Sequence, residues 1–176
     1  MRLPLLLLTA VALAAGVGVT WAAAQLTASS EPAAEIVAVP DAAAVSASAA
    51  AAGPVTVHRD ANCGCCGEHV AHLEQAGFTI EEVVHDDAAE VAALKDAHGI
   101  PAGMRSCHTS IVEGYAVEGH VPADVIAALL TERPEVDGIA LPGMPTGSPG
   151  MPGEQSETWI FEAFADGAAQ EAFTQR

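Results

Sequence analysis

The chain has 176 residues, a length that fits one compact domain together with a targeting segment. Its 23 Asp and Glu residues outnumber its 6 Lys and Arg residues, so the formal net charge is −17. A surface this acidic repels nucleic acid and anionic lipid, and the composition therefore argues against either as a partner. Aromatic residues make up only 4%, so we expect a core built from Val, Ile, Leu and a few Phe.

The first 24 residues have the pattern of a secretory signal peptide. Arg2 supplies a positive start, residues 5–19 are largely apolar, and Ala22 and Ala24 offer an A-x-A cleavage site. The apolar stretch approaches the roughly 20 residues that cross a bilayer, so an uncleaved anchor is the alternative and the only membrane contact expected. Both interpretations place the rest of the chain outside the cytoplasm.

Residues 25–53 are mostly Ala, Ser, Pro, Val and Glu, with no clear hydrophobic period. Such a segment buries too little apolar surface to offset the conformational entropy lost on ordering. We predict a disordered linker here, with at most a transient helix at the alanine run 49–52. The folded domain is then expected to span residues 54–176.

Strands and helices alternate in the predicted domain. A β-branched alternation from Val55 predicts the first strand, and Asp87 with Glu90 resembles a capping box that opens a helix. The Asp166-Gly167 pair predicts the turn of a closing hairpin. In chain order we expect a strand at 55–58, a helix at 67–76, a strand at 78–85, a helix from 87 to about 98, strands at 109–113 and 115–121, a helix from 122 to before 134, a loop at 138–153, and hairpin strands at 159–164 and 168–173.

The first seven of these elements follow the order β-α-β-α-β-β-α, which is the order of a thioredoxin-like α/β fold. Three cysteines, Cys63, Cys65 and Cys66, fall within four positions between the first strand and the first helix. A helix N-terminus lowers the pKa of a thiol and favours thiolate. Cys107 lies at the start of the third strand, which borders that helix in a thioredoxin-like sheet. We therefore expect the four sulfurs to face one another.

Three chemistries fit four such sulfurs. Two structural disulfides suit an exported protein with an even number of cysteines, although the side chains of neighbouring Cys65 and Cys66 diverge. A thiol–disulfide oxidoreductase would use the C-x-x-C pair Cys63 and Cys66. Against it, Cys65 would compete as a nucleophile, and Ser106 stands near the place of the proline expected before the third strand. The third chemistry is a metal site, which we rank first, ahead of redox exchange and structural bridging.

Copper is the metal that crowded thiols favour. Zinc in a tetrahedral site needs every ligand to converge on one ion, which is awkward for adjacent Cys65 and Cys66. Cu(I) selects thiolate ligands and can be shared through bridging sulfurs in a multinuclear cluster. The sequence therefore predicts copper, as Cu(I), at Cys63, Cys65, Cys66 and Cys107, with zinc less favoured.

Several histidines and methionines are candidate auxiliary ligands. His108 follows Cys107 and could ligate, donate a proton or face away, because successive strand residues point to opposite faces. His69 and His72 share a helix face with Cys65 and are either outer ligands or part of a solvated face. Met144 and Met151 could offer thioethers to copper or fill gaps in packing. His120 is placed at the end of the fourth strand, and we expect ordinary strand-end or surface roles for His58, His85 and His98.

Five segments together carry a resemblance to a known family. They are Val55-Thr56-Val57, Cys63-Gly64-Cys65-Cys66-Gly67, Ser106-Cys107-His108-Thr109, Glu118-Gly119-His120-Val121-Pro122 and the Gly/Met/Pro stretch 142–151. From about residue 54 to 173 the chain resembles the CopG-like family, exported proteins of bacterial copper-resistance systems. The resemblance implies a thioredoxin-like domain in the periplasm whose four cysteines bind copper.

The resulting hypothesis is a periplasmic copper-binding protein for copper resistance and homeostasis. Its four cysteines would hold Cu(I), with His108 as a candidate auxiliary group. Since thiolates can cycle between bound metal and disulfide, the site could also exchange electrons with copper and act as an oxidoreductase. Expected partners are copper ions and other periplasmic copper-resistance proteins. The alternative is a thiol–disulfide oxidoreductase that uses Cys63 and Cys66.

Overall fold

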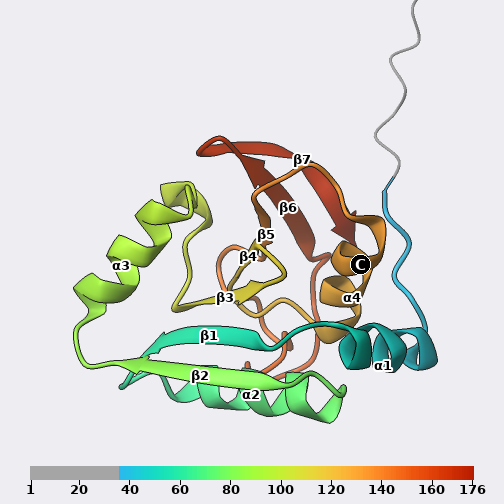
Figure 1. The fold of residues 1–176 in the computed structure, drawn as a ribbon, viewed down its shortest axis with the longest axis horizontal. Coiled ribbons are helices and arrows are strands. Elements are labelled where there is room, and N and C mark those ends of the chain that lie inside the picture. The colour runs from blue at the N-terminus through green and yellow to red at the C-terminus, as the bar shows by residue number, and fades with distance from the viewer. Residues whose placement is uncertain (1–35) are drawn as a thin grey trace, which may run out of the picture. The chain divides into compact units, whose positions relative to one another are not determined.

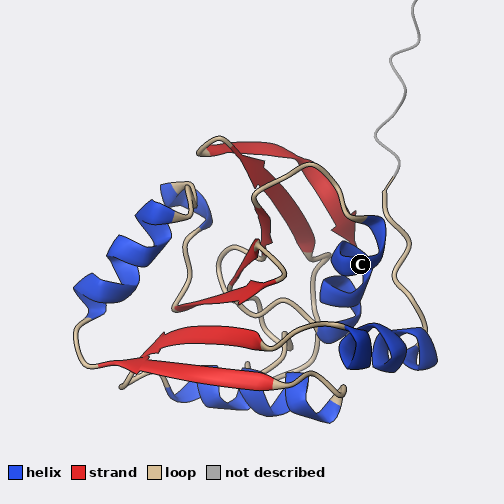
Figure 2. Cartoon of the chain, in the orientation of Figure 1, coloured by secondary structure: helices blue, strands red, loops and turns tan. Residues whose placement is uncertain are grey.

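A computed structural model describes residues 36–176 of the chain (Figures 1 and 2). All described residues belong to one compact unit, residues 32–176. The predicted signal segment 1–24 and linker residues 25–35 lie outside the described residues. Within residues 36–176, no helix combines the length and the apolar character needed to cross a membrane.

The described residues form a mixed α/β domain with four α-helices and a seven-stranded sheet. The helices are α1 (Ala42–Ala51), α2 (Gly64–Gln75), α3 (Ala88–Ala97) and α4 (Ala123–Glu132), with a short 3-10 turn at Ala102–Met104. The strands are β1 (Val55–Asp60), β2 (Ile80–His85), β3 (His108–Val112), β4 (Tyr115–Glu118), β5 (Gly138–Ala140), β6 (Ile160–Ala165) and β7 (Ala168–Gln175).

The strands lie in the order β2-β1-β3-β4-β5-β6-β7. β1 runs parallel to β2 and antiparallel to β3, and β3 is antiparallel to β4. The predicted order β-α-β-α-β-β-α is therefore confirmed from β1 to α4, while the thioredoxin-like assignment itself stays a prediction. Beyond α4, β5 pairs parallel with β4, and the β6–β7 hairpin extends the sheet further.

Two apolar clusters pack against opposite faces of the sheet, while the edge strand β2 is largely exposed. Alternate residues of a strand point to opposite faces, and Val117 belongs to a large core cluster while neighbouring Ala116 belongs to a smaller one. The large cluster includes residues from α1, α2 and α4, whereas the smaller one contains Ile100 and Met104 from the segment after α3. The end of β1 pairs with the start of β3, Arg59 with His108, just before the turn into α2.

The structure differs from the predicted disordered linker over residues 42–51, which form α1. Asp41 caps the helix by accepting a hydrogen bond from the N–H of Ala44 at 2.9 Å, and Val45 and Ala49 are buried as α1 packs against α4 (Figure 1). Alanine has the highest helix propensity, and its small side chain lets two helices approach closely. The segment lacks an amphipathic period because packing on α4 requires only two apolar positions one turn apart.

The C-terminal part agrees with the predicted hairpin but not with the predicted loop boundaries. Asp166 and Gly167 both have positive φ, 52° and 74°, as a type I′ hairpin turn requires. The predicted loop 138–153 instead begins with β5. A Cβ added to Gly138 would lie 1.8 Å from the carbonyl oxygen of Ala116, so only glycine permits this close strand pairing.

Candidate metal centre

The turn between β1 and α2 presents three of the four cysteines. Cys63 is the N-cap residue of α2, and its N–H donates to the carbonyl of Asp60 at 3.1 Å. The side chain of Asp60 accepts a hydrogen bond from the N–H of Asn62 at 2.7 Å. These two bonds close the turn and hold the cysteines at the N-terminus of α2.

Cys107 approaches the same turn from β3. It directly precedes His108, the first residue of β3, which pairs with Arg59 of β1 in antiparallel register. Since β1 leads straight into the cysteine turn, this register places Cys107 opposite the start of α2. The sequence-based expectation that Cys107 faces the other three cysteines is met by this geometry.

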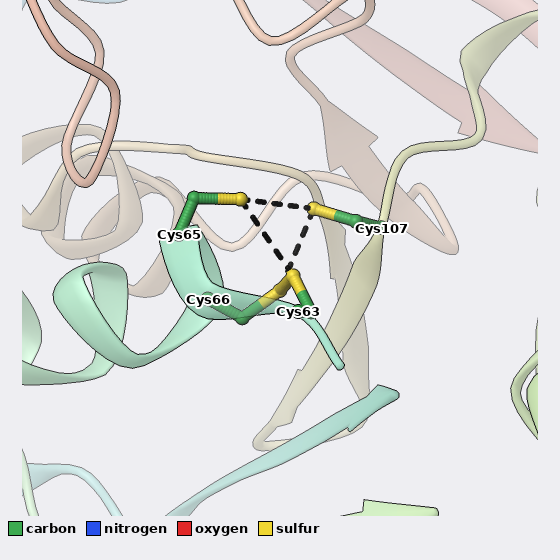
Figure 3. A group of neighbouring side chains, drawn as sticks. All are labelled: Cys63, Cys65, Cys66 and Cys107. Atoms are coloured by element: carbon green, nitrogen blue, oxygen red, sulfur yellow. Dashed lines mark hydrogen bonds between the residues drawn. A yellow bond between two sulfur atoms is a disulfide. The ribbon is translucent and has the colours of Figure 1, made fainter. Parts of the chain in front are cut away.

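The four sulfur atoms form one compact group (Figure 3). Cys107 Sγ lies 3.5 Å from Cys66 Sγ and 4.0 Å from Cys65 Sγ, and Cys65 Sγ lies 3.6 Å from Cys63 Sγ. Cys63 and Cys66 are joined by a disulfide, whereas Cys65 and Cys107 are free. The C-x-x-C pair thus adopts the bond expected for redox exchange, and the group is a disulfide with two thiols instead of four thiols.

The thiol of Cys107 has a pKa well above its usual value. Burial, followed by the proximity of Cys65, raises the pKa of the Cys107 thiol to about 11. In the metal-free protein this thiol therefore stays protonated at neutral pH. A soft metal must displace its proton, as metal binding at thiols generally does.

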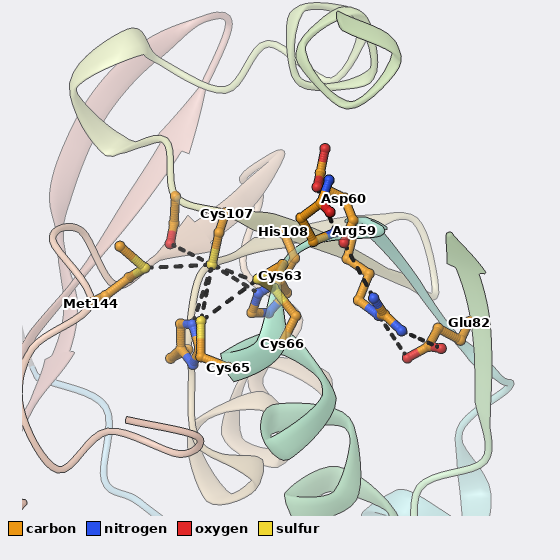
Figure 4. The surroundings of a disulfide bond; sticks show 12 residues. Arg59, Asp60, Cys63, Cys65, Cys66, Glu82, Cys107, His108 and Met144 are labelled. Atoms are coloured by element: carbon orange, nitrogen blue, oxygen red, sulfur yellow. Dashed lines mark hydrogen bonds and ion pairs between the residues drawn. A yellow bond between two sulfur atoms is a disulfide. The ribbon is translucent and has the colours of Figure 1, made fainter. Parts of the chain in front are cut away.

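Imidazole and thioether donors also lie beside Cys107, among them His108 and Met144, which Figure 4 labels. His120 Nε2 and Met144 Sδ each lie 3.4 Å from Cys107 Sγ, and His108 Nδ1 lies 3.8 Å away. His108 and His120 are fully buried. Sequence reasoning named His108 and Met144 as candidates but assigned no role to His120, whose only signal was its place in the Glu118-Gly119-His120-Val121-Pro122 segment.

His69 completes a group of imidazoles behind the sulfurs. Its ring centroid lies 4.6 Å from that of His108 and 5.4 Å from that of His120. His69 Nε2 lies 2.9 Å from the carbonyl oxygen of Val121, while His69 Nδ1 and His108 Nε2 are buried without a hydrogen-bond partner. Burial lowers the pKa of His69 to about 4 and the pKa of His108 well below its usual range. Both rings are therefore neutral at neutral pH, the state in which imidazole binds metals.

The backbone before Cys107 is fixed by a buried charged network. Glu118 accepts hydrogen bonds from Lys95 Nζ at 2.5 Å and from Thr109 Oγ1 at 2.6 Å. The same carboxylate accepts the N–H of Ser106. Glu118 is fully buried and Lys95 is 5% exposed, so this network ties α3, β3 and β4 to the residue that positions Cys107.

The loop between β5 and β6 (residues 141–159, the C-terminal loop) closes the other side of the centre. The carbonyl oxygen of Pro149 lies 2.6 Å from His120 Nδ1, and Met144 comes from the same loop. A Cβ on Gly150 would lie 2.5 Å from the carbonyl oxygen of Cys65. This loop therefore packs directly on the cysteine turn and on His120.

Two predicted candidates lie outside the donor group. His72 Nε2 accepts a hydrogen bond from the N–H of Ala123 at 3.1 Å and so caps the start of α4. The backbone of Met151 closes a turn, because its N–H donates a hydrogen bond to the carbonyl oxygen of Ser148 at 2.7 Å. Cys65, His69 and His72 all lie on α2 at the predicted helical spacing. His69 packs against His108, whereas His72 contacts the start of α4.

A groove of about 520 Å³ borders the centre and reaches Cys63 and Cys107. Its other walls come from α3, the cysteine turn and the segment before Cys107. Neither cysteine is fully buried, so the groove gives small molecules access to the sulfurs. The remaining lining residues are Asp60, Asn62, Ala88, Val91, Ala92, Lys95, Arg105 and Ser106.

Part of this centre lies in a segment that matches a known sequence family. The sequence family described as "Protein of unknown function, DUF411" matches residues 104–151, a stretch that contains Cys107, His108, His120 and Met144. A search of curated proteins finds no match.

Two solved structures are similar over most of the domain. Copper resistance protein CopG, Form 2, is 42% identical, with a TM-score of 0.63, and the match covers 70% of this chain and 97% of that one. Form 1 has the same identity and TM-score, with 70% and 96% covered.

Proposed function

Because the chain belongs to the family of copper resistance protein CopG, we propose that it is a periplasmic protein that binds copper as Cu(I) and serves copper resistance. Copper is here the cargo that the protein handles. The export signal predicted at residues 1–24 supports the periplasmic location. Separation of periplasm from cytoplasm, followed by detection of the protein, checks that part of the proposal.

One observation carries the proposal: the donors around Cys107 are soft and convergent. Within 4.0 Å of Cys107 Sγ lie two cysteine sulfurs, the thioether of Met144 and both His108 and His120. Thiolate and thioether ligands select Cu(I), and imidazole also binds copper. Hard cations such as Mg²⁺ and Ca²⁺ require a shell of oxygen ligands, whereas the side chains within 4.0 Å of Cys107 Sγ offer one oxygen, the Ser106 hydroxyl at 3.9 Å.

The number of sulfurs favours more than one copper ion. Cys65 and Cys66 are adjacent in the chain, yet both lie within 4.0 Å of Cys107 Sγ. Once the disulfide of Cys63 and Cys66 is reduced, four thiolates share one small volume, and bridging sulfurs are the way to use all of them. We therefore propose a small multinuclear Cu(I) cluster.

The disulfide supports a redox role for the same centre. Oxidation of the Cys63 and Cys66 thiols to the disulfide releases two protons and two electrons, which reduce two Cu(II) ions to two Cu(I) ions. The reverse reaction oxidises two Cu(I) ions and restores the dithiol. The centre would thereby interconvert the two oxidation states of copper while Cys65, Cys107 and the imidazoles hold the ions.

Anaerobic titration of the reduced protein with Cu(I) against a competing chelator tests the proposal. We expect tight uptake of more than one copper per protein, with all four thiols protected from alkylation. The variant Cys65→Ser should lower the stoichiometry. Uptake no greater than that of a variant with all four cysteines replaced by serine would remove copper binding as the function.

A matched pair of methionine variants tests the contribution of the C-terminal loop. Leu and Met have similar volumes, so both Met144→Leu and Met151→Leu should change stability by less than about 1.5 kcal/mol. Only Met144 contacts Cys107 Sγ, and we expect Met144→Leu alone to weaken Cu(I) binding about tenfold, which corresponds to about 1.4 kcal/mol. Equal affinities of the two variants would show that the thioether does not bind copper.

A thiol–disulfide oxidoreductase is the second candidate, and the disulfide between Cys63 and Cys66 beside an open groove favours it. This function needs only the C-x-x-C pair. It predicts reduction of a model disulfide such as insulin that survives in Cys65→Ser and disappears in Cys63→Ser. Activity with that dependence, without copper uptake, would move this function to first place.

A further inference from the structure

A pair of neighbouring histidines, His58 and His85, lies outside the cysteine centre, at the β2 edge of the sheet. In the parallel register, His58 of β1 pairs with Val83 of β2, and His85 lies two residues beyond Val83. Residues two apart on a strand share a face, so both imidazoles project from the same side of the sheet. Their facing nitrogens, His58 Nδ1 and His85 Nε2, are 3.1 Å apart.

That separation suits two ligands of one ion. Imidazole nitrogens lie about 2.0–2.1 Å from a transition metal such as zinc, and at tetrahedral or square angles two such ligands are about 3 Å apart. The adjacent strands fix the spacing, since six backbone pairs from Val55↔Ile80 to Asp60↔His85 hold β1 and β2 in register. Neither ring therefore has to move far to accept an ion between them.

A carboxylate orients one of the two rings. Glu90, in the first turn of α3, lies with Oε2 2.8 Å from His85 Nδ1. A proton on Nδ1 that is donated to Glu90 leaves the lone pair of His85 on Nε2, facing His58. Metal-binding histidines commonly donate their second N–H to a carboxylate in this way, which fixes the tautomer and raises ligand basicity.

The second ring is also suited to binding. Burial, and then the neighbouring His85 and His98, lower the pKa of His58. In the metal-free protein His58 Nδ1 shares a hydrogen bond with His85 Nε2. Moving the His58 proton from Nδ1 to Nε2 turns both facing nitrogens into lone-pair donors without any change in backbone.

We propose that His58 and His85, with Glu90 as the orienting carboxylate, form a site for a divalent late transition metal ion. Imidazole donors suit Cu(II) and Zn(II), and the general order of affinities places Cu(II) above Zn(II) at nitrogen sites. The two ligands leave positions open for water or for another ligand. This site shares no residue with the cysteine centre, and it takes the divalent ions that a thiolate cluster for Cu(I) does not select.

Titration of the ¹⁵N-labelled protein with Zn(II) tests the site, because zinc is diamagnetic and has no redox chemistry that would oxidise the cysteines. The readout is the imidazole ¹⁵N signals of each histidine together with bound zinc from equilibrium dialysis. We expect the His58 and His85 signals to shift together and to saturate with one zinc ion. The double variant His58→Gln/His85→Gln should bind one zinc ion fewer than the unmodified protein.

A pair of glutamate variants tests the role of the carboxylate. Glu90→Gln should weaken zinc binding at the pair about tenfold or more, as removal of an orienting carboxylate commonly does. Glu81→Gln, on the exposed part of β2, removes the same charge nearby and should leave the affinity unchanged. Equal loss in both variants would reduce the role of Glu90 to general electrostatic attraction and overturn its part in the proposal.

The imidazole signals separate this site from the cysteine centre. Zinc bound at the cysteines shifts His108 and His120 but leaves His58 and His85 in place. Unchanged His58 and His85 signals at millimolar zinc would overturn the site and leave the pair as a hydrogen bond. So would a double variant that folds, as judged by circular dichroism, and binds as much zinc as the unmodified protein.

Discussion

The buried histidines of the centre can take up protons as well as offer nitrogen donors to copper. Burial is the largest cause of the low pKa of His69, His108 and His120, and each also lies beside another imidazole of the group. Protonation of any of these rings would place a charge in a poorly solvated space. The metal-free protein should therefore be less stable in mild acid than at neutral pH.

His69 provides a measurable case. Its folded-state pKa of about 4 lies below the usual 6.5, so between these pH values the unfolded chain binds more protons than the folded protein. Stability is then fully present above pH 6.5 and falls as the pH drops towards 4, by on the order of 3 kcal/mol for this group. Urea unfolding of the metal-free protein should show that His69→Gln has a smaller loss between pH 7 and 4.5. An equal loss in both proteins would contradict this assignment.

Single residues near the cysteines were only partly predictable from the sequence. The density of Cys63, Cys65 and Cys66 identified the centre, because three sulfurs in four positions are rare by chance. His120 and Met144 reach Cys107 from 13 and 37 residues further along the chain. No local spacing connects such residues, since their proximity depends on how β4 and the C-terminal loop pack.

At the scale of elements, the charged pair of Lys95 and Glu118 connects α3 to the sheet. It lies where helix and strand meet, and Thr109 of β3 contacts both members. Removal of one partner from a buried ion pair leaves the other charged and unpaired. The pair therefore fixes the position of α3 and, through Ser106, the start of β3.

Lys95→Met tests this connection. The change keeps an apolar stem but leaves Glu118 without its cation, and we expect the free energy of unfolding to fall by about 3–5 kcal/mol. The double variant Lys95→Met/Glu118→Gln carries no buried charge and should recover part of that loss. Chemical denaturation of the three proteins gives the comparison. A single variant as stable as the unmodified protein would show that water reaches Glu118.

Elements with a strong local signal were predicted well, whereas those that depend on a partner were not. The hairpin turn at Asp166-Gly167 and the helix begun by Asp87 follow from local chemistry, and Asp87 caps α3 through a bond to the N–H of Ala89. Glu90 does not complete the predicted capping box, because it contacts His85 instead. β5 was missed since three residues carry no periodicity, and α1 because its stability comes from α4.

At the scale of the whole molecule, the centre is assembled from both halves of the folded domain. The N-terminal half supplies the cysteine turn and the segment up to β4, and the C-terminal loop brings Met144 and the carbonyl of Pro149 onto it. At Gly150 the backbone of the loop packs so tightly that an added Cβ would lie 3.0 Å from the N of His69 and 3.2 Å from His120 Nδ1. Closure of the loop therefore depends on the absence of a side chain there.

A comparison of two glycines in this loop separates the effect of loop closure on copper binding from the effect of backbone strain. Gly143 and Gly150 both have positive φ, 78° and 87°, so alanine at either position should cost about 1–2 kcal/mol in backbone conformation. An added methyl group meets nothing within 4 Å at Gly143 but would clash with the carbonyl of Cys65 at Gly150. We expect both variants to lose stability, and only Gly150→Ala to move Met144 and Pro149 away from the centre.

The measurement is Cu(I) affinity under a competing chelator, alongside thermal unfolding of the same two variants. Gly143→Ala should keep its affinity for copper, whereas Gly150→Ala should lose about tenfold, as in Met144→Leu, because the same thioether is withdrawn. Faster alkylation of Cys65 and Cys107 in metal-free Gly150→Ala would show that the loop had opened. If both variants bind copper equally well, the N-terminal half holds the ions by itself and the C-terminal loop only covers them.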